Sequence, residues 1–268
     1  HLIKKLYKNN RLLILDNFQR GKMDNELKLL IKNKNVKLLN VDLVSLKKFP
    51  KNSFDYIFFL ASVVGVKNVN QNPFLTLETN VQTIFNTLNF AKSHKNTKLI
   101  YFSTSEVYSP LYQKPIKKFP IKENVDLLLN SEKNPRDTYL ISKIFGEKLI
   151  EFYGKPYLVL RPHNIYGPRM GLSHVVPEQI LKIKKNIRSK VFSPNHKRAF
   201  CFIDDAINQI LFLSESNKHN NNIFNIGNHK EPIKMLKLCE IIKKKLKSKT
   251  ILLNDKNTKG SVSTRVPY

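Results

Sequence analysis

The segment Lys98-Leu-Ile-Tyr-Phe-Ser-Thr-Ser-Glu-Val-Tyr108 decides the fold class, because an apolar run changes abruptly into hydroxyl and carboxyl side chains. A short continuous apolar run is typical of a strand buried on both faces of a parallel sheet. The polar residues then lie at the carboxyl end of that strand, where ligands bind in such sheets. Four further runs have the same character, at residues 11–15, 36–41, 54–62 and 157–161.

Helical patterns alternate with these runs. Long amphipathic helices are expected over 72–94 and 135–153, and shorter ones over 177–186, 203–213 and 232–246, with one more strand at 223–226. Strands that alternate with helices predict an α/β fold with a doubly wound parallel sheet. From about His163 the composition changes, which indicates a smaller C-terminal lobe.

Composition narrows the classes of protein. A hydrophobic fraction of 41% over 268 residues is enough for a buried core. The formal charge of +27 comes mostly from lysine spread along the whole chain, which is a poor match to the clustered footprint of a nucleic-acid binder. Cys201 and Cys239 make no disulfide or metal framework, and no apolar run reaches about 20 residues. We therefore expect a soluble, cytoplasmic protein that binds neither nucleic acid, membrane nor metal.

Tyr139 and Lys143 carry the first chemical signal. Four residues apart on a helix, they lie on one face, and a nearby ammonium lowers the pKa of a phenol toward neutrality. Tyr139 could then act as a general base, although a surface pair would show the same spacing. Thr104 adds a hydroxyl at a ligand-facing strand end. Together the three residues suit hydride transfer from a substrate alcohol.

With these motifs the chain resembles the extended short-chain dehydrogenase/reductases that act on nucleotide sugars. The matching segments are Leu15-Asp-Asn-Phe18, Leu60-Ala-Ser62, Asn80, Ser103-Thr-Ser-Glu-Val-Tyr108, Tyr139-Leu-Ile-Ser-Lys143, Arg161-Pro-His-Asn-Ile-Tyr-Gly-Pro-Arg169, Arg198-Ala-Phe-Cys-Phe-Ile-Asp-Asp205 and Gly260-Ser-Val-Ser-Thr-Arg265. The resemblance implies a Rossmann-type domain for NAD at 1–162, with 203–228 returning to it. A substrate-binding lobe would then comprise 163–202 and 229–268.

The resemblance also implies roles for individual residues. Tyr139, Lys143 and Thr104 would be catalytic, with Ser105 and Glu106 beside them. NAD would contact Tyr139 and Lys143 and also Asp16, Asn17, Asp42, Leu43, Leu60, Ala61, Ser62, Asn80 and Pro162. An acid at position 16 favours NAD over NADP. The nucleotide sugar (UDP-, dTDP- or GDP-linked) would contact Thr104, Asn164, Val175, Arg198 and Arg265, whereas Arg161 is expected to have a structural role.

One departure from the family pattern concerns the pyrophosphate site. Members open with a strand and a Gly-x-x-Gly-x-x-Gly turn, and the eight glycines of this chain nowhere have that spacing. His1-Leu-Ile resembles the helix that follows the turn. We therefore expect a truncated chain that lacks the first strand and that, on its own, has low stability, weak NAD affinity and no activity.

Ser105 disfavours a dehydratase, because it stands where the dehydratases of this family have an aspartate. The sequence favours a nucleotide-sugar epimerase that forms a 4-keto intermediate. A UDP-glucuronate decarboxylase is the first alternative, because Thr104-Ser-Glu106 is also typical of those enzymes. A non-catalytic relative that only binds NAD or nucleotide sugars is the second. The helices at 72–94 and 135–153 would pair across a homodimer.

Overall fold

The computed structural model describes residues 1–268 except 47, 51–52, 95, 114–118, 256–263 and 268. The chain divides into two compact units. Unit 1 comprises residues 1–102, 133–159 and 211–222, and unit 2 comprises residues 103–132, 160–210 and 223–268.

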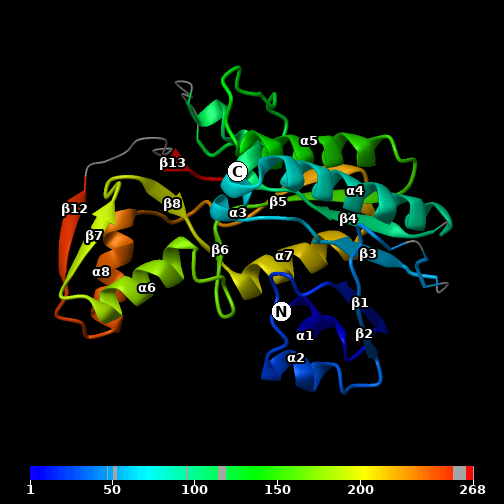
Figure 1. Cartoon of the computed structure of the whole chain (residues 1–268), viewed down its shortest axis with the longest axis horizontal. Helices are drawn as coiled ribbons and strands as arrows, with labels where there is room; N and C mark the ends of the chain where they lie inside the picture. The colour runs from blue at the N-terminus through cyan, green and yellow to red at the C-terminus, as the bar shows by residue number, and fades with distance from the viewer. Residues whose placement is uncertain (47, 51–52, 95, 114–118, 256–263, 268) are drawn as a thin grey trace. The chain divides into compact units, whose positions relative to one another are not determined.

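In unit 1, the N-terminal segment forms a parallel strand pair with two short helices (Figure 1, blue). Strand β1 (Leu12–Asp16) pairs in parallel with β2 (Val36–Asn40). Helix α1 (Leu2–Leu6) precedes them, and α2 (Asn25–Leu30) connects them. Asp24 caps α2 by accepting a 2.9 Å hydrogen bond from the Leu27 amide, as an aspartate does at the start of a helix. Both strands therefore end at the same edge of their sheet.

A second sheet has the strand order β10-β5-β4-β3. Its strands are β3 (Tyr56–Phe59), β4 (Lys98–Phe102), β5 (Tyr157–Pro162) and β10 (Asn222–Ile226). Strands β3 and β4 are parallel. Strand β5 runs the same way, because Leu99 N donates to Pro156 O and, four residues on, Ser103 N donates to Leu160 O. The division into units passes through β5, whose first half belongs to unit 1 and whose second half belongs to unit 2.

Two long helices of unit 1, α4 (Pro73–Lys92) and α5 (Asp137–Glu151), lie side by side (Figure 1). Pro73 occupies the first turn of α4, where its missing N–H costs nothing, and α3 (Val66–Gln71) precedes it. The core of the unit is apolar, and its buried side chains include Ile84, Leu88, Leu99, Ile100, Tyr101, Leu140, Ile150, Leu158 and Val159. The continuous burial of β4 explains why its apolar run has no polar alternation.

Unit 2 carries a second small core. Strands β7 (Arg188–Phe192) and β12 (Ile251–Asp255) are parallel, and α6 (Val175–Lys185) and α8 (Met235–Lys245) pack against β7. The buried cluster consists of Ile183, Val191, Met235, Leu238, Cys239 and Ile242. Strand β8 (Lys197–Ala199) lies between β11 (Pro232–Lys234) and β13 (Thr264–Arg265), while β6 (Ile165–Tyr166) pairs with β9 (Cys201–Phe202). Helix α7 (Ile203–Glu215) follows β9.

The α/β fold class with parallel strands predicted from the sequence is confirmed. Two boundaries were wrong. The strand expected over 54–62 is limited to β3, so Leu60, Ala61 and Ser62 lie in the loop after it. The helix expected from Pro232 begins at Met235, because residues 232–234 pair antiparallel with β8 instead. Among the described residues, every helix is too short or too polar to cross a bilayer.

Candidate active site

Tyr139 and Lys143 lie on the first half of α5 and differ sharply in exposure. Tyr139 is half-buried, whereas Lys143 is only 4% exposed. The Lys143 Nζ atom lies 5.8 Å from the centroid of the Tyr139 ring and donates a 2.9 Å hydrogen bond to the carbonyl of Phe102 at the end of β4. Burial lowers the pKa of Lys143 to about 7, and the carboxylate of Glu147 opposes that shift. The pair is therefore an interior arrangement, which rules out the surface-pair alternative.

Asn80 fixes the backbone around this pair. From α4, its Oδ1 accepts a 2.7 Å hydrogen bond from the Val63 amide in the loop after β3. Its Nδ2 donates 3.1 Å to the Ser142 hydroxyl, and that hydroxyl donates 2.8 Å to the Tyr139 carbonyl. Because Asn80 is 3% exposed, these bonds are protected from water. The side chain thus joins the loop that contains Ser62 to the turn of α5 that carries Tyr139.

Two aspartates lie at the carboxyl ends of the parallel pair β1 and β2. Asp16 ends β1 with an exposed side chain, and its Oδ1 accepts a 2.7 Å bond from the amide of Phe18, whose φ is 52°. Asn17 accepts similarly from Gln19. Asp42 follows β2 and accepts from the Val44 amide, while Asn86 of α4 donates to the carbonyl of Leu43. An exposed carboxylate at a strand end fits the hydroxyls of a ribose.

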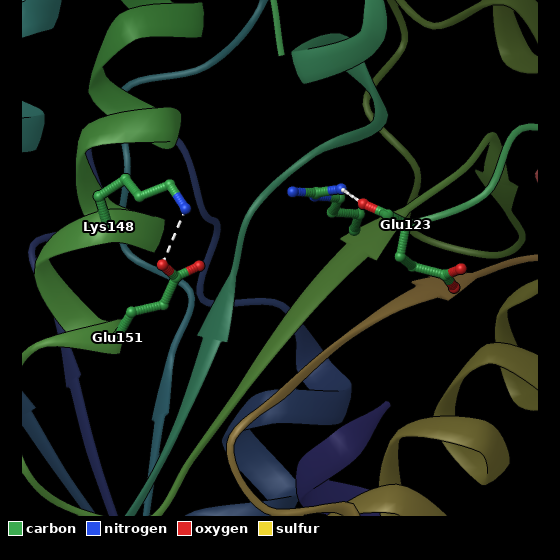
Figure 2. Close-up of polar contacts among 4 residues, drawn as sticks. Glu123, Lys148 and Glu151 are labelled. Carbon is green, nitrogen blue, oxygen red and sulfur yellow. Dashed lines mark hydrogen bonds and ion pairs between the residues drawn. The ribbon is translucent and has the colours of Figure 1, made fainter. Parts of the chain in front are cut away.

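In unit 2, Thr104 begins the short 3₁₀ helix η1 (Ser105–Tyr108) and accepts a 3.2 Å bond from the Glu106 amide. Buried polar contacts hold the other end of η1. The Tyr108 hydroxyl donates 2.9 Å to Asn225 Oδ1 and accepts 2.7 Å from Arg161. Arg161 also donates to the Glu123 carbonyl, as Figure 2 shows at the labelled Glu123. The Arg161 side chain is 2% exposed, and these hydrogen bonds agree with the structural role expected for it.

The residues expected to bind the nucleotide sugar also lie in unit 2. Arg198 on β8 and Arg265 on β13 are register partners on neighbouring parallel strands, so the backbone brings them together. The side chain of Arg265 and the rest of its motif, Gly260–Ser263, fall outside the described residues. Asn164 adopts φ 43° and donates 3.0 Å to the Ala199 carbonyl. Val175 begins α6 and packs against the small core.

Sequence reasoning missed two residues beside Lys143. Glu147 is fully buried one turn further along α5, and Tyr101 of β4 places its ring 5.1 Å from the Lys143 Nζ. Burial, with Glu147 and Tyr139 adding to it, raises the pKa of Tyr101 well above its ordinary value, so this phenol stays neutral. The signal for Glu147 was present, because positions 139, 143 and 147 continue one four-residue spacing.

A parallel α/β sheet with a tyrosine and a buried lysine one turn apart on α5 defines the class, which is the extended short-chain dehydrogenase/reductases. The chain belongs to the NAD dependent epimerase/dehydratase family, whose model matches residues 1–227. Members act on nucleotide sugars with NAD as cofactor.

Curated relatives and solved structures agree with this assignment. A UDP-N-acetyl-alpha-D-glucosaminuronate decarboxylase of Bacillus cytotoxicus is 30% identical over 241 residues, which cover 86% of this chain and 72% of the relative. A putative UDP-glucose 4-epimerase of Methanocaldococcus jannaschii is 28% identical over 98% of this chain and 83% of the relative. The fold matches a UDP-N-acetylglucosamine 4-epimerase of Methanobrevibacter ruminantium M1 with a TM-score of 0.84 at 23% identity, over 100% of this chain and 84% of that one.

Proposed function

We propose that the protein is a nucleotide-sugar epimerase that works through a 4-keto intermediate. The observation that supports this most directly is the half-buried Tyr139 next to the buried Lys143 amine. A sugar hydroxyl has a pKa far above 7, so its oxidation needs a base whose proton affinity is matched to neutral pH. A phenol beside an ammonium meets that need, because the positive charge stabilises the phenolate.

In this proposal Tyr139 removes the proton from the C4 hydroxyl while a hydride leaves C4, and the C4–O bond becomes a carbonyl. NAD, when bound, supplies the acceptor for that hydride. The Thr104 hydroxyl would hydrogen-bond a sugar oxygen, and an ammonium at Lys143 would favour the phenolate form of Tyr139. When bound, the same cofactor would return the hydride, and its delivery to the opposite face of the C4 carbonyl would invert C4. Arg198 and Arg265 bind the diphosphate, whose oxygens suit two guanidinium groups.

The proposed contacts involve the adenosine and the nicotinamide of NAD. Asp16, Asn17, Asp42 and Leu43 lie at the ends of β1 and β2, where they would bind the adenosine. Ala61, Ser62 and Asn80 lie in or against the loop after β3, where they would bind near the nicotinamide together with Tyr139, Lys143, Leu60 and Pro162. The glycines of this chain do not have the spacing of the family's pyrophosphate-binding turn.

Substituting Tyr139 tests the catalytic assignment. Measured in the full-length protein, Tyr139→Phe removes one oxygen and keeps the ring, so NAD binding should persist while kcat falls by about 10²–10⁴-fold. Steady-state turnover of UDP-sugars with NAD, together with a calorimetric NAD titration, measures both quantities. Turnover equal to that of the wild type would rule out Tyr139 as the base.

A decarboxylase is the second candidate, because Thr104-Ser-Glu106 fits that chemistry and the 30% identical relative is named as a decarboxylase. In that reaction the 4-keto acid loses its carboxyl group as carbon dioxide. Incubating the enzyme with NAD and UDP-glucuronate, and measuring released carbon dioxide together with C4 inversion by NMR, separates the two candidates. Inversion without gas release supports the epimerase, and stoichiometric release of carbon dioxide overturns it.

A further inference from the structure

Three titratable side chains lie on one face of α5, and each is more deeply buried than the one before it. Tyr139 is half-buried, Lys143 is 4% exposed and Glu147 is 0% exposed. The four-residue spacing places each of them one turn beyond the previous one on the same helix face. Nothing in the proposed mechanism uses Glu147. A carboxyl group is rarely buried completely unless another charge or several donors compensate it.

Among the described residues, Glu147 is the carboxylate whose charge acts on the buried amine of Lys143. The facing groups are the neutral Tyr101 from β4 and, on α5 itself, Tyr139 and Glu147. The charged residues of α4, Glu78 and Lys92, are exposed, and Asn80 and Ile84 contribute no charge. The Phe102 carbonyl satisfies only one of the three N–H donors of the amine.

We propose that Glu147 is a positioning residue that compensates the buried charge of Lys143 and so keeps the amine available as an ammonium beside Tyr139. Glu147 touches neither substrate nor cofactor in this role and acts through Lys143. The inference rests on the proposed function only where Lys143 acts on Tyr139. The compensation itself is a property of the folded chain and can be measured without substrate.

The linkage to stability follows from the pKa values. The unfolded chain holds the Lys143 proton up to about pH 10.4, whereas the folded chain releases it above about pH 7. Between these values the unfolded state binds more protons, so stability falls as pH falls toward 7 and levels off below it. Without Glu147 the folded pKa lies lower, and the loss continues below pH 7. Each further unit lowers the folding equilibrium constant tenfold.

The test is a denaturant-unfolding series between pH 6 and pH 9 on E147Q, E147D and the full wild-type chain. Glu147→Gln keeps the shape and removes the charge. We expect the stability gap between E147Q and wild type to widen on acidification from pH 9 to pH 6, by up to about tenfold in the folding equilibrium constant, and E147D to close part of the gap. A gap that is the same at pH 6 and pH 9 indicates a packing role and overturns the proposal.

The matched control is Glu151→Gln, one turn further along α5. Glu151 pairs with Lys148 at 2.8 Å, as Figure 2 shows, and the Lys148 side chain is 61% exposed. A pair that water still reaches contributes little, so this variant should show no widening gap.

The double variant K143M/E147Q decides the case even if E147Q fails to fold at pH 6. Replacing a buried pair by uncharged side chains is often tolerated, whereas removing one partner is not. The double variant should therefore be more stable than E147Q at pH 6, and a double variant no more stable than E147Q overturns the proposal. The enzymatic arm is separate: kcat of E147Q should fall with little change in KM. A linkage without nucleotide-sugar turnover leaves the Glu147 assignment standing and rejects the proposed function.

Discussion

Gly146 of α5 packs closely against Tyr101 and Ile84. A methyl group at this position would lie 2.2 Å from the Tyr101 hydroxyl oxygen and 2.8 Å from Ile84 Cδ1, and Tyr101 is completely buried. Glycine is unfavourable inside a helix by about 1 kcal/mol relative to alanine. Its presence in the middle of α5 is therefore explained by close packing against β4 and α4.

Gly146→Ala should consequently destabilise the protein in spite of its gain in helix propensity. Overpacking typically costs about 1–3 kcal/mol, which exceeds that gain over most of its range. The free energy of unfolding from a denaturant titration measures the change. Lys148→Ala, an exposed change on the same helix, should stay within about 0.5 kcal/mol. An alanine variant as stable as wild type would show that Tyr101 can move aside.

For individual residues, the sequence predicted the features that depend only on spacing along one helix. Tyr139 and Lys143 were recognisable because helix geometry alone places them on one face. The burial of Glu147 could not be predicted from the sequence, because it depends on which face of α5 packs against β4. The same limit applies to Lys98, which opens β4 and is 5% exposed because its amine donates to the carbonyls of Ser214 and Ser216, more than 100 residues away in the chain.

The carboxyl end of helix α4 is hydrogen-bonded by Lys155, which lies in the loop between α5 and β5. The Lys155 amine donates to the carbonyls of Ala91 at 3.0 Å, Lys92 at 3.3 Å and His94. The last carbonyls of a helix have no partner within the helix and carry partial negative charge, so a cation is favourable there.

Lys155→Met should therefore lower the free energy of unfolding by about 1.5–3 kcal/mol, the usual contribution of hydrogen bonds to a charged group. Lys92→Met is the matched control, because Lys92 lies in the last turn of the same helix with its side chain exposed. Thermal and denaturant unfolding of both variants gives the comparison. Equal effects would mean that any cation near the end of α4 is sufficient.

The long helices and the strands of the first 162 residues were predicted well, whereas β7, β12 and the shortest strands of unit 2 were missed. The run 98–102 is β4 residue for residue, since continuous apolar character marks a buried strand. Strands β6, β8, β9, β11 and β13 have two or three residues each, too few to show a period. They form where a neighbouring segment offers hydrogen bonds, as β8 does between β11 and β13. The arginine pairing on β8 and β13 was therefore visible only in the structure.

For the whole molecule, one surface of unit 1 stands out as apolar. A groove of about 310 Å³ between α4 and α5 is lined by Phe74, Leu77, Glu78, Val81, Ile141 and Phe145. Phe74 is 76% exposed. The two helices are those that the family resemblance assigns to a dimer interface, and an exposed apolar patch commonly marks such a contact. We propose that a second copy of this chain covers the groove.

Phe74→Glu should then convert a dimer to a monomer, because pairing would bury an uncompensated carboxylate in both copies. Sedimentation velocity at micromolar concentration measures the state. Phe152→Glu is the control, since Phe152 is 86% exposed at the end of α5 and does not line the groove. A wild-type chain that sediments as a monomer would contradict the proposal.

The inward-pointing amines of Lys98, Lys143 and Lys155 set a limit on protein engineering. Because the formal charge of the chain is +27, its lysines are obvious targets for replacement by arginine or glutamate. Each of these three amines ends on main-chain carbonyl oxygens, where a compact ammonium fits and a flat guanidinium fork does not. A charge-redesigned version should keep these three lysines and can change exposed ones far more freely.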